Sequence, residues 1–184
     1  AGMSNQLSKT TLNKKQQFCL DTINSASENL LVIINDILDL SKIEAGKLSL
    51  EKIAFEPGEV IKRAIQVLIH KAEEKGLQMG NSFFDEKTSP VLIGDPYRLN
   101  QILLNILNNA IKFTEKGTVD IRLTVLNDGR LTQTIQVDIE DTGIGMDDSF
   151  KDSLFEKFSQ EEASVTRQYG GTGLGMSICK QLIE

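Results

Sequence analysis

Three polar side chains share one face of a helix that the sequence predicts between residues 95 and 113. Asn105, Asn109 and Lys112 stand at positions i, i+4 and i+7, so they stack along that face. An asparagine amide offers an oxygen to a hard cation, and a lysine one turn further on can neutralise phosphate oxygens. Taken alone, these residues would more simply be a solvated polar face, so the pattern needs support from elsewhere in the chain.

A second group of residues that could bind a ligand directly follows a predicted strand. It consists of Asp141, Gly143 and Gly145 in the run Asp-Thr-Gly-Ile-Gly-Met. A carboxylate at a strand end can accept a hydrogen bond from the exocyclic amine of adenine, whereas guanine presents a carbonyl oxygen there. The two glycines would let the backbone approach the base. The alternative is a plain turn, because Asp and Gly are common in turns.

The third group is a glycine-rich run at the start of the last predicted helix. It comprises Gly171, Thr172, Gly173, Leu174 and Gly175. Glycine-rich backbone at a helix N-terminus is suited to binding phosphate. The spacing matches neither the G-x-G-x-x-G of dinucleotide-binding folds nor the G-K-[ST] of a Walker loop. The run therefore indicates a phosphate-binding segment of another kind.

The elements that must position these groups follow from the hydrophobic spacing. Helical spacing predicts helices over 14–46, 56–75, 95–113 and 174–184, with Asp95 as an N-cap. Alternation predicts strands over 48–55, 119–125 and 135–139, with a turn at 127–129, and shorter extended runs at 77–84 and 91–93. We therefore expect an α+β fold, in which helices cover one face of a mixed sheet.

The predicted helix over 14–46 carries two adjacent apolar seams. One runs from Ile23 to Leu40 and the other comprises Leu31, Ile34 and Leu38. Two adjoining seams are typical of a helix in a bundle. The alternative is an amphipathic helix packed on its own domain. Gly46 is expected to end the helix.

Composition excludes some classes of function. The 184 residues carry a net charge of −6, which argues against nucleic acid as a partner because phosphate neutralisation needs a basic face. The sequence contains no apolar run near the ~20 residues that a membrane span needs. The two cysteines and single histidine cannot supply the four ligands of a structural zinc site, so we expect unbridged thiols.

In this order, the motifs resemble those of the sensor histidine kinases, and among them the hybrid kinases. The resemblance rests on an asparagine box at 95–114, glycine boxes at 141–145 and 171–175, a phenylalanine box at 155–158 and a helix end at 36–46. It implies a Bergerat-type α/β sandwich for binding ATP over 47–184, without the family's final strand hairpin. It also implies that residues 1–46 are the C-terminal part of a dimerisation and histidine-phosphotransfer domain, mainly its second helix.

The resemblance further implies a role for each site residue. Asn109 would ligate Mg²⁺, and Asn105 would lie near the phosphates as the candidate catalytic residue. The other implied contacts to ATP are adenine recognition by Asp141 with Gly143 and Gly145, packing by Phe113, phosphate contacts from Lys112 and Arg167, and backbone contacts from Gly171, Thr172, Gly173, Leu174 and Gly175. Residues 147–170 would form a mobile lid anchored by Phe155 and Phe158.

The family's phosphoacceptor box, a histidine followed by an acid, Arg, Thr and Pro, is missing from the sequence. The only histidine, His70, is expected on the surface, so the chain alone should not autophosphorylate. The implied partners are a second copy, through the 14–46 bundle, and a receiver domain or response regulator in a phosphorelay. The implied location is the cytoplasmic part of a larger sensor, with membrane contact only through other parts of it. The alternatives are an ATPase of the related gyrase, mismatch-repair and heat-shock type, and a non-catalytic nucleotide sensor.

Overall fold

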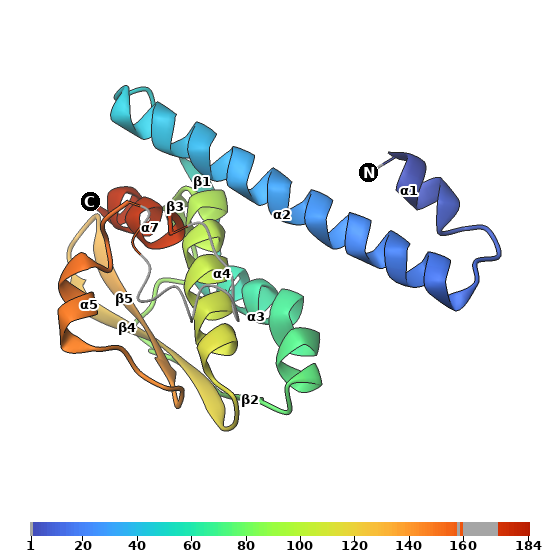
Figure 1. Cartoon of the computed structure of the whole chain (residues 1–184). Coiled ribbons are helices and arrows are strands. Elements are labelled where there is room, and N and C mark those ends of the chain that lie inside the picture. Colours follow the sequence, from blue (N-terminus) through green and yellow to red (C-terminus); the bar gives the residue numbers. More distant parts are fainter. Residues whose placement is uncertain (1, 158, 160–172) are drawn as a thin grey trace. The chain divides into compact units, whose positions relative to one another are not determined.

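The computed structural model describes residues 2–157, 159 and 173–184 (Figure 1). The chain divides into two compact units, Ala1–Leu48 and Ser49–Glu184. Within the described residues, no helix combines the length and the apolar character that crossing a membrane requires.

The first unit is helical. A short helix, α1 (Gly2–Leu7), precedes the long helix α2 (Lys14–Glu44). Asn13 caps α2: its Oδ1 accepts from the Gln16 amide at 2.9 Å, while the Asn13 amide donates to Gln16 Oε1 at 3.0 Å. Gly46, with φ of +62°, follows the helix end, which confirms the predicted stop.

The apolar seams of α2 are largely exposed in the single chain. Ile23, Leu30, Leu31 and Leu38 each expose between 51% and 57% of their surface. Burying such a surface is favourable by roughly 25 cal/mol per Å². The bundle that the two seams predict would bury this surface, and it stays a prediction.

The second unit is built on a mixed three-stranded sheet in the order β2-β4-β5. β2 (Gln78–Phe84) runs parallel to β4 (Thr118–Asp128), which pairs antiparallel with β5 (Gln133–Asp141). Alternate residues of β4 point into the core, where Val119, Ile121 and Leu123 are buried.

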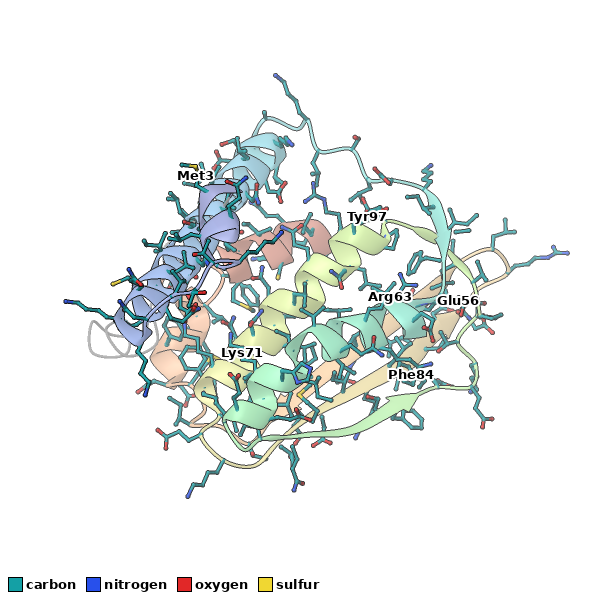
Figure 2. The ribbon with its side chains drawn as sticks, turned by 90° about the vertical axis from the view of Figure 1, so that its right-hand side faces the viewer. Met3, Glu56, Arg63, Lys71, Phe84 and Tyr97 are labelled. Atoms are coloured by element: carbon teal, nitrogen blue, oxygen red, sulfur yellow. The ribbon has the colours of Figure 1, made fainter. Side chains whose placement is uncertain are left out.

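Two helices cover one face of this sheet, α3 (Pro57–Glu74) and α4 (Pro96–Phe113) (Figure 1). Their buried residues form one core with β4 and include Ile61, Leu68, Leu103 and Leu107. Phe84 of β2 packs beneath α3, because its ring lies 3.8 Å from the place of a Cβ at Gly58 (Figure 2). The predicted α+β fold with helices on one face is confirmed.

Asp95 caps α4, as its sequence predicts. Its Oδ1 accepts from the amides of Tyr97 and Arg98 at 3.1 and 3.0 Å, and its Oδ2 accepts from the Glu51 amide at 3.0 Å. Burial opposes the ionisation of Asp95, but these three amides and the Arg98 charge hold its pKa below the usual value.

The predicted strand over 48–55 was too long. Only β1 (Ile53–Phe55) is a strand, because its partner β3 (Leu92–Gly94) offers three residues and the Glu51 amide already bonds to Asp95. The predicted turn at 127–129 also lies further along. The pair Asp128–Gln133 still belongs to the β4–β5 ladder, and the Gly129 amide donates to the Thr132 carbonyl at 2.9 Å.

The last elements lie near the chain's C-terminal end. A short helix, α5 (Asp148–Ser153), lies within the predicted lid over 147–170. The final helix is α7 (Gly175–Ile183), which packs against α4. Neither of the sequence's two cysteines forms a disulfide in the described part of the chain; Cys19 is exposed and Cys179 is buried on α7.

Candidate functional site

The polar face of α4 is half-buried. Asn105, Asn109 and Lys112 are neither buried nor fully exposed, whereas Leu103 and Leu107 enter the core. The Asn109 side chain makes no hydrogen bond with the described residues, so its amide oxygen is available to a ligand.

Asn108, although it stands next to Asn109 in the sequence, belongs to a different side of α4. Its Oδ1 accepts from Lys71 Nζ at 2.8 Å, and its Nδ2 donates to the Leu104 carbonyl at 2.9 Å. Lys71 comes from α3, which lies beside α4 (Figure 2). Asn108 therefore links α3 to α4 and is not part of the candidate site, whereas Asn105 and Asn109 are.

Asn105 contacts the start of α7. Its Nδ2 donates to the Gly175 carbonyl at 3.4 Å and to Cys179 Sγ at 3.7 Å. A Cβ added at Gly175 would lie 3.0 Å from Asn105 Oδ1 and 3.2 Å from both Cγ and Nδ2. The glycine therefore lets the amide of Asn105 lie directly against the backbone of α7.

The glycine-rich run can offer only backbone at Leu174. The Leu174 side chain is fully buried, and its carbonyl accepts from the Ile178 amide and the Ser177 hydroxyl at 2.9 and 2.8 Å. Gly173, just before it, has φ of +69°, a conformation that favours glycine. These features leave the backbone of residues 173–175 at the N-terminus of α7, where anions bind well.

Asp141 ends β5 next to the C-terminus of α4. Its Oδ1 accepts from the Gly143 amide at 2.9 Å and from the buried Thr114 hydroxyl at 3.4 Å. Its Oδ2 accepts no hydrogen bond within the described part of the chain, and the residue is exposed. The carboxylate is thus oriented by one oxygen and leaves the other for a hydrogen-bond donor.

The two glycines after Asp141 serve different needs. A Cβ at Gly143 would lie 2.6 Å from the Phe113 carbonyl oxygen and 2.7 Å from Asp141 Oδ1. Gly145 has open space around it but a φ of +72°. The Ile144 amide between them donates to the same Phe113 carbonyl at 3.2 Å, so the motif is tied to the last turn of α4.

That last turn carries Lys112 and Phe113, with Lys112 Nζ 4.6 Å from the centre of the Phe113 ring. Burial, and then the positive charge of Lys71, lower the pKa of Lys112 below 10.5. A cation held partly out of water near a second cation favours the approach of an anion. The surroundings of Lys112 therefore favour an anionic neighbour.

Two residues around the site have no motif in the sequence. Lys75 Nζ donates to the carbonyls of Ile111 and Lys112, each at 2.8 Å, and to that of Thr114 at 3.3 Å. It satisfies carbonyls that a helix leaves without a partner at its C-terminus. Cys179 is the other, and no pattern in the sequence pairs it with Asn105.

Several predicted site residues lie outside the described residues: Arg167, Gly171, Thr172 and Phe158. The same holds for half of the predicted lid, residues 158 and 160–170. Phe155 is described: it is 43% exposed, and Lys180 Nζ of α7 lies 5.7 Å from the centre of its ring.

Two family models match this sequence. Residues 1–46 match the His Kinase A (phospho-acceptor) domain. Residues 94–184 match the histidine kinase-, DNA gyrase B- and HSP90-like ATPase. The second match contains all the site residues described above on α4, after β5 and on α7.

Curated relatives and solved structures agree with these matches. Hybrid signal transduction histidine kinase L of Dictyostelium discoideum is 42% identical over 183 residues, which is 100% of the chain and 11% of that protein. Signal transduction histidine-protein kinase BarA of Escherichia coli strain K12 is 43% identical over 176 residues, 96% of the chain and 19% of that protein. The structure of full-length ShkA, solved in complex with AMPPNP, is similar at a TM-score of 0.77 and 27% identity. The match covers 98% of this chain and 36% of the ShkA chain. The chain thus spans a small part of these relatives.

Proposed function

Because the chain belongs to the sensor histidine kinases, and among them to the hybrid kinases, we propose that residues 47–184 bind MgATP as the catalytic half of a protein-histidine kinase. One observation carries the proposal: both glycine motifs meet the same helix. Gly143 lies against the Phe113 carbonyl and Gly175 against the Asn105 amide, each too closely for an unhindered side chain. The residues that would bind adenine and those that would bind phosphate therefore both lie along α4. The AMPPNP bound to ShkA supports a nucleotide there.

The chain's own groups divide the work of binding. Asp141 Oδ2 would accept from the adenine amine, because Oδ1 is already held by Gly143 and Thr114. Phe113 would pack on the nucleotide. Lys112 would neutralise phosphate oxygens at a place where burial makes its charge effective. Arg167 and the backbone of 171–175 would complete the phosphate contacts.

Within the described residues, no three His, Cys, Asp or Glu side chains gather as a metal site. The donor set still fits Mg²⁺, which accepts one or two protein oxygens together with phosphate oxygens. Mg²⁺, when bound, would bridge phosphates and neutralise their charge, with Asn109 as its protein ligand. We expect Asn109→Ala to remove the Mg²⁺-dependent part of ATP affinity and leave circular dichroism unchanged. Unchanged calorimetric titrations with and without Mg²⁺ would contradict this assignment.

The acceptor of the phosphoryl group is proposed to be a histidine outside these 184 residues. The only histidine here, His70, is on α3 with a side chain 87% exposed, and its Nδ1 lies 3.4 Å from Glu73 Oε2. Among the described residues, no hydrogen bond or ion pair joins His70 to Asn105, Asn109 or Lys112. The chain alone should therefore not autophosphorylate, although Asn105 could assist transfer to an imidazole supplied by another segment.

The wider assignments are a homodimer formed through the exposed seams of α2, and a receiver domain as the next acceptor in a phosphorelay. The match to the His Kinase A domain and the hybrid relatives support both. We place the chain in the cytoplasmic part of a larger sensor, without nucleic acid as a partner and with membrane contact only through other parts of that protein.

Radiolabelled ATP distinguishes the kinase from its two alternatives. The chain is incubated with [γ-³²P]ATP, Mg²⁺ and a separate pair of helices that carries the family's histidine box. A kinase labels that histidine with acid-labile phosphate, a related ATPase releases inorganic phosphate, and a nucleotide sensor does neither. His70→Ala is the control: acid-labile label on the chain that disappears in this variant would place the acceptor on His70.

A further inference from the structure

We propose that Cys179 is a positioning residue whose sulfur, together with the Gly175 carbonyl, fixes the orientation of the Asn105 amide. The consequence for phosphoryl transfer rests on the proposed function, whereas the orientation itself does not. Nothing in the motifs assigns a role to this cysteine, which lies four residues beyond the last glycine of the run.

The contacts saturate the nitrogen of the amide. Asn105 Nδ2 lies 3.4 Å from the Gly175 carbonyl oxygen and 3.7 Å from Cys179 Sγ. A carboxamide nitrogen carries two hydrogens, and sulfur is a weak acceptor at such a distance. Residues 175 and 179 are i and i+4 on α7, so both acceptors are on the same face of that helix.

The orientation decides which atom of Asn105 faces a ligand. With Nδ2 committed to α7, Oδ1 is the atom left to accept, and it accepts nothing from the described residues. A flipped amide would turn the NH₂ group towards the site, and that group could donate a hydrogen bond to a ligand but not accept one. An oxygen near the transferred phosphoryl group and an attacking imidazole is the chemically useful choice.

The surroundings make the sulfur a fixed acceptor. Cys179 is only 2% exposed, and α7 packs on α4. Gly175 lets the amide lie close to α7, since a Cβ there would lie 3.0 Å from Asn105 Oδ1 and 3.2 Å from Nδ2. Because the glycine run leads directly into α7, the segment that would hold phosphate also carries both acceptors that orient Asn105.

The test compares two substitutions that keep the core filled. Cys179→Val retains an apolar side chain of similar volume but removes the acceptor, whereas Cys179→Ser retains an acceptor. Ile178→Val is the matched control, because Ile178 is fully buried on the same helix and its trimming changes packing only. In a ¹⁵N-labelled chain, the Asn105 side-chain NH₂ pair is assigned by its disappearance in Asn105→Asp.

We expect Cys179→Val to shift that pair and increase its mobility, while Cys179→Ser and Ile178→Val leave its order close to that of the parent chain. In transfer to the separate histidine-box helices, Cys179→Val should lower kcat about tenfold with the KM for ATP changed less than about twofold, and Cys179→Ser should recover most of kcat.

An unchanged NH₂ pair in Cys179→Val would overturn the proposal and leave Cys179 as core filling. An equal loss of kcat in Cys179→Val and Cys179→Ser would overturn the proposal as well. If the NH₂ pair responds as expected but the parent chain transfers no phosphate, the kinase assignment fails and the positioning role stands, because the spectroscopic result needs no transfer.

Discussion

Replacing each glycine after Asp141 by alanine should have very different effects. In Gly143→Ala, the new Cβ would lie 2.6 Å from the Phe113 carbonyl oxygen, 3.0 Å from its carbon and 2.7 Å from Asp141 Oδ1. Ordinary contacts of this kind are ~3.4 Å, so the backbone must move by about 0.8 Å. In Gly145→Ala the new Cβ meets nothing within 4 Å, and only the φ of +72° opposes it.

The magnitudes follow from these contacts. Gly143→Ala strains the packing and disturbs the bonds Gly143 N to Asp141 Oδ1, at 2.9 Å, and Ile144 N to the Phe113 carbonyl, at 3.2 Å. Overpacking and one or two weakened hydrogen bonds together should lower the free energy of unfolding by about 2–4 kcal/mol. Gly145→Ala should cost about 1–2 kcal/mol, the penalty of a left-handed backbone for a non-glycine residue.

The assays are thermal unfolding and calorimetric titration with MgATP. Gly143→Ala should lower Tm by about 6–14 °C and weaken ATP binding about tenfold or more, because Asp141 loses the amide that orients it. Gly145→Ala should lower Tm by less than about 7 °C and change the affinity less. Equal losses in both variants, or a Gly143→Ala chain with parental Tm and affinity, would refute the argument from contacts.

Three further predictions concern charged groups. Lys75→Met should lower the free energy of unfolding by about 1–2 kcal/mol in urea titrations, since the last carbonyls of α4 lose a cation; an unchanged midpoint would contradict this. Asp141→Asn should weaken ATP binding by about 1.5–3 kcal/mol without a gain for GTP, and equal parental affinities for ATP and GTP would exclude Asp141 as an adenine contact. Because the pKa of Lys112 is depressed below 10.5, ATP affinity should fall as the pH rises through that lower pKa, while stability rises with pH between it and the unfolded value. Lys112→Arg, which keeps its charge, should flatten the alkaline fall in affinity.

Local chemistry made much of this protein predictable. Asp95 followed by Pro96 predicts the start of α4, and the structure confirms the cap. Gly46 predicts the end of α2, and its positive φ confirms it. The polar face of Asn105 and Asn109 follows from helical spacing alone. Each of these features depends on neighbours within one or two turns.

What only the tertiary structure decided involves residues far apart in sequence. Asn105 meets Cys179 across 74 positions, and Lys75 reaches the end of α4 across 36; both depend on how α7 and α3 pack on α4. The same packing turns Asn108 to Lys71 rather than to the site. The extent of β1 was set by its three-residue partner β3. Composition and periodicity predict which kinds of residue share a face of a helix or strand. The register between two elements instead depends on how their side chains fit together, and no local pattern contains that information.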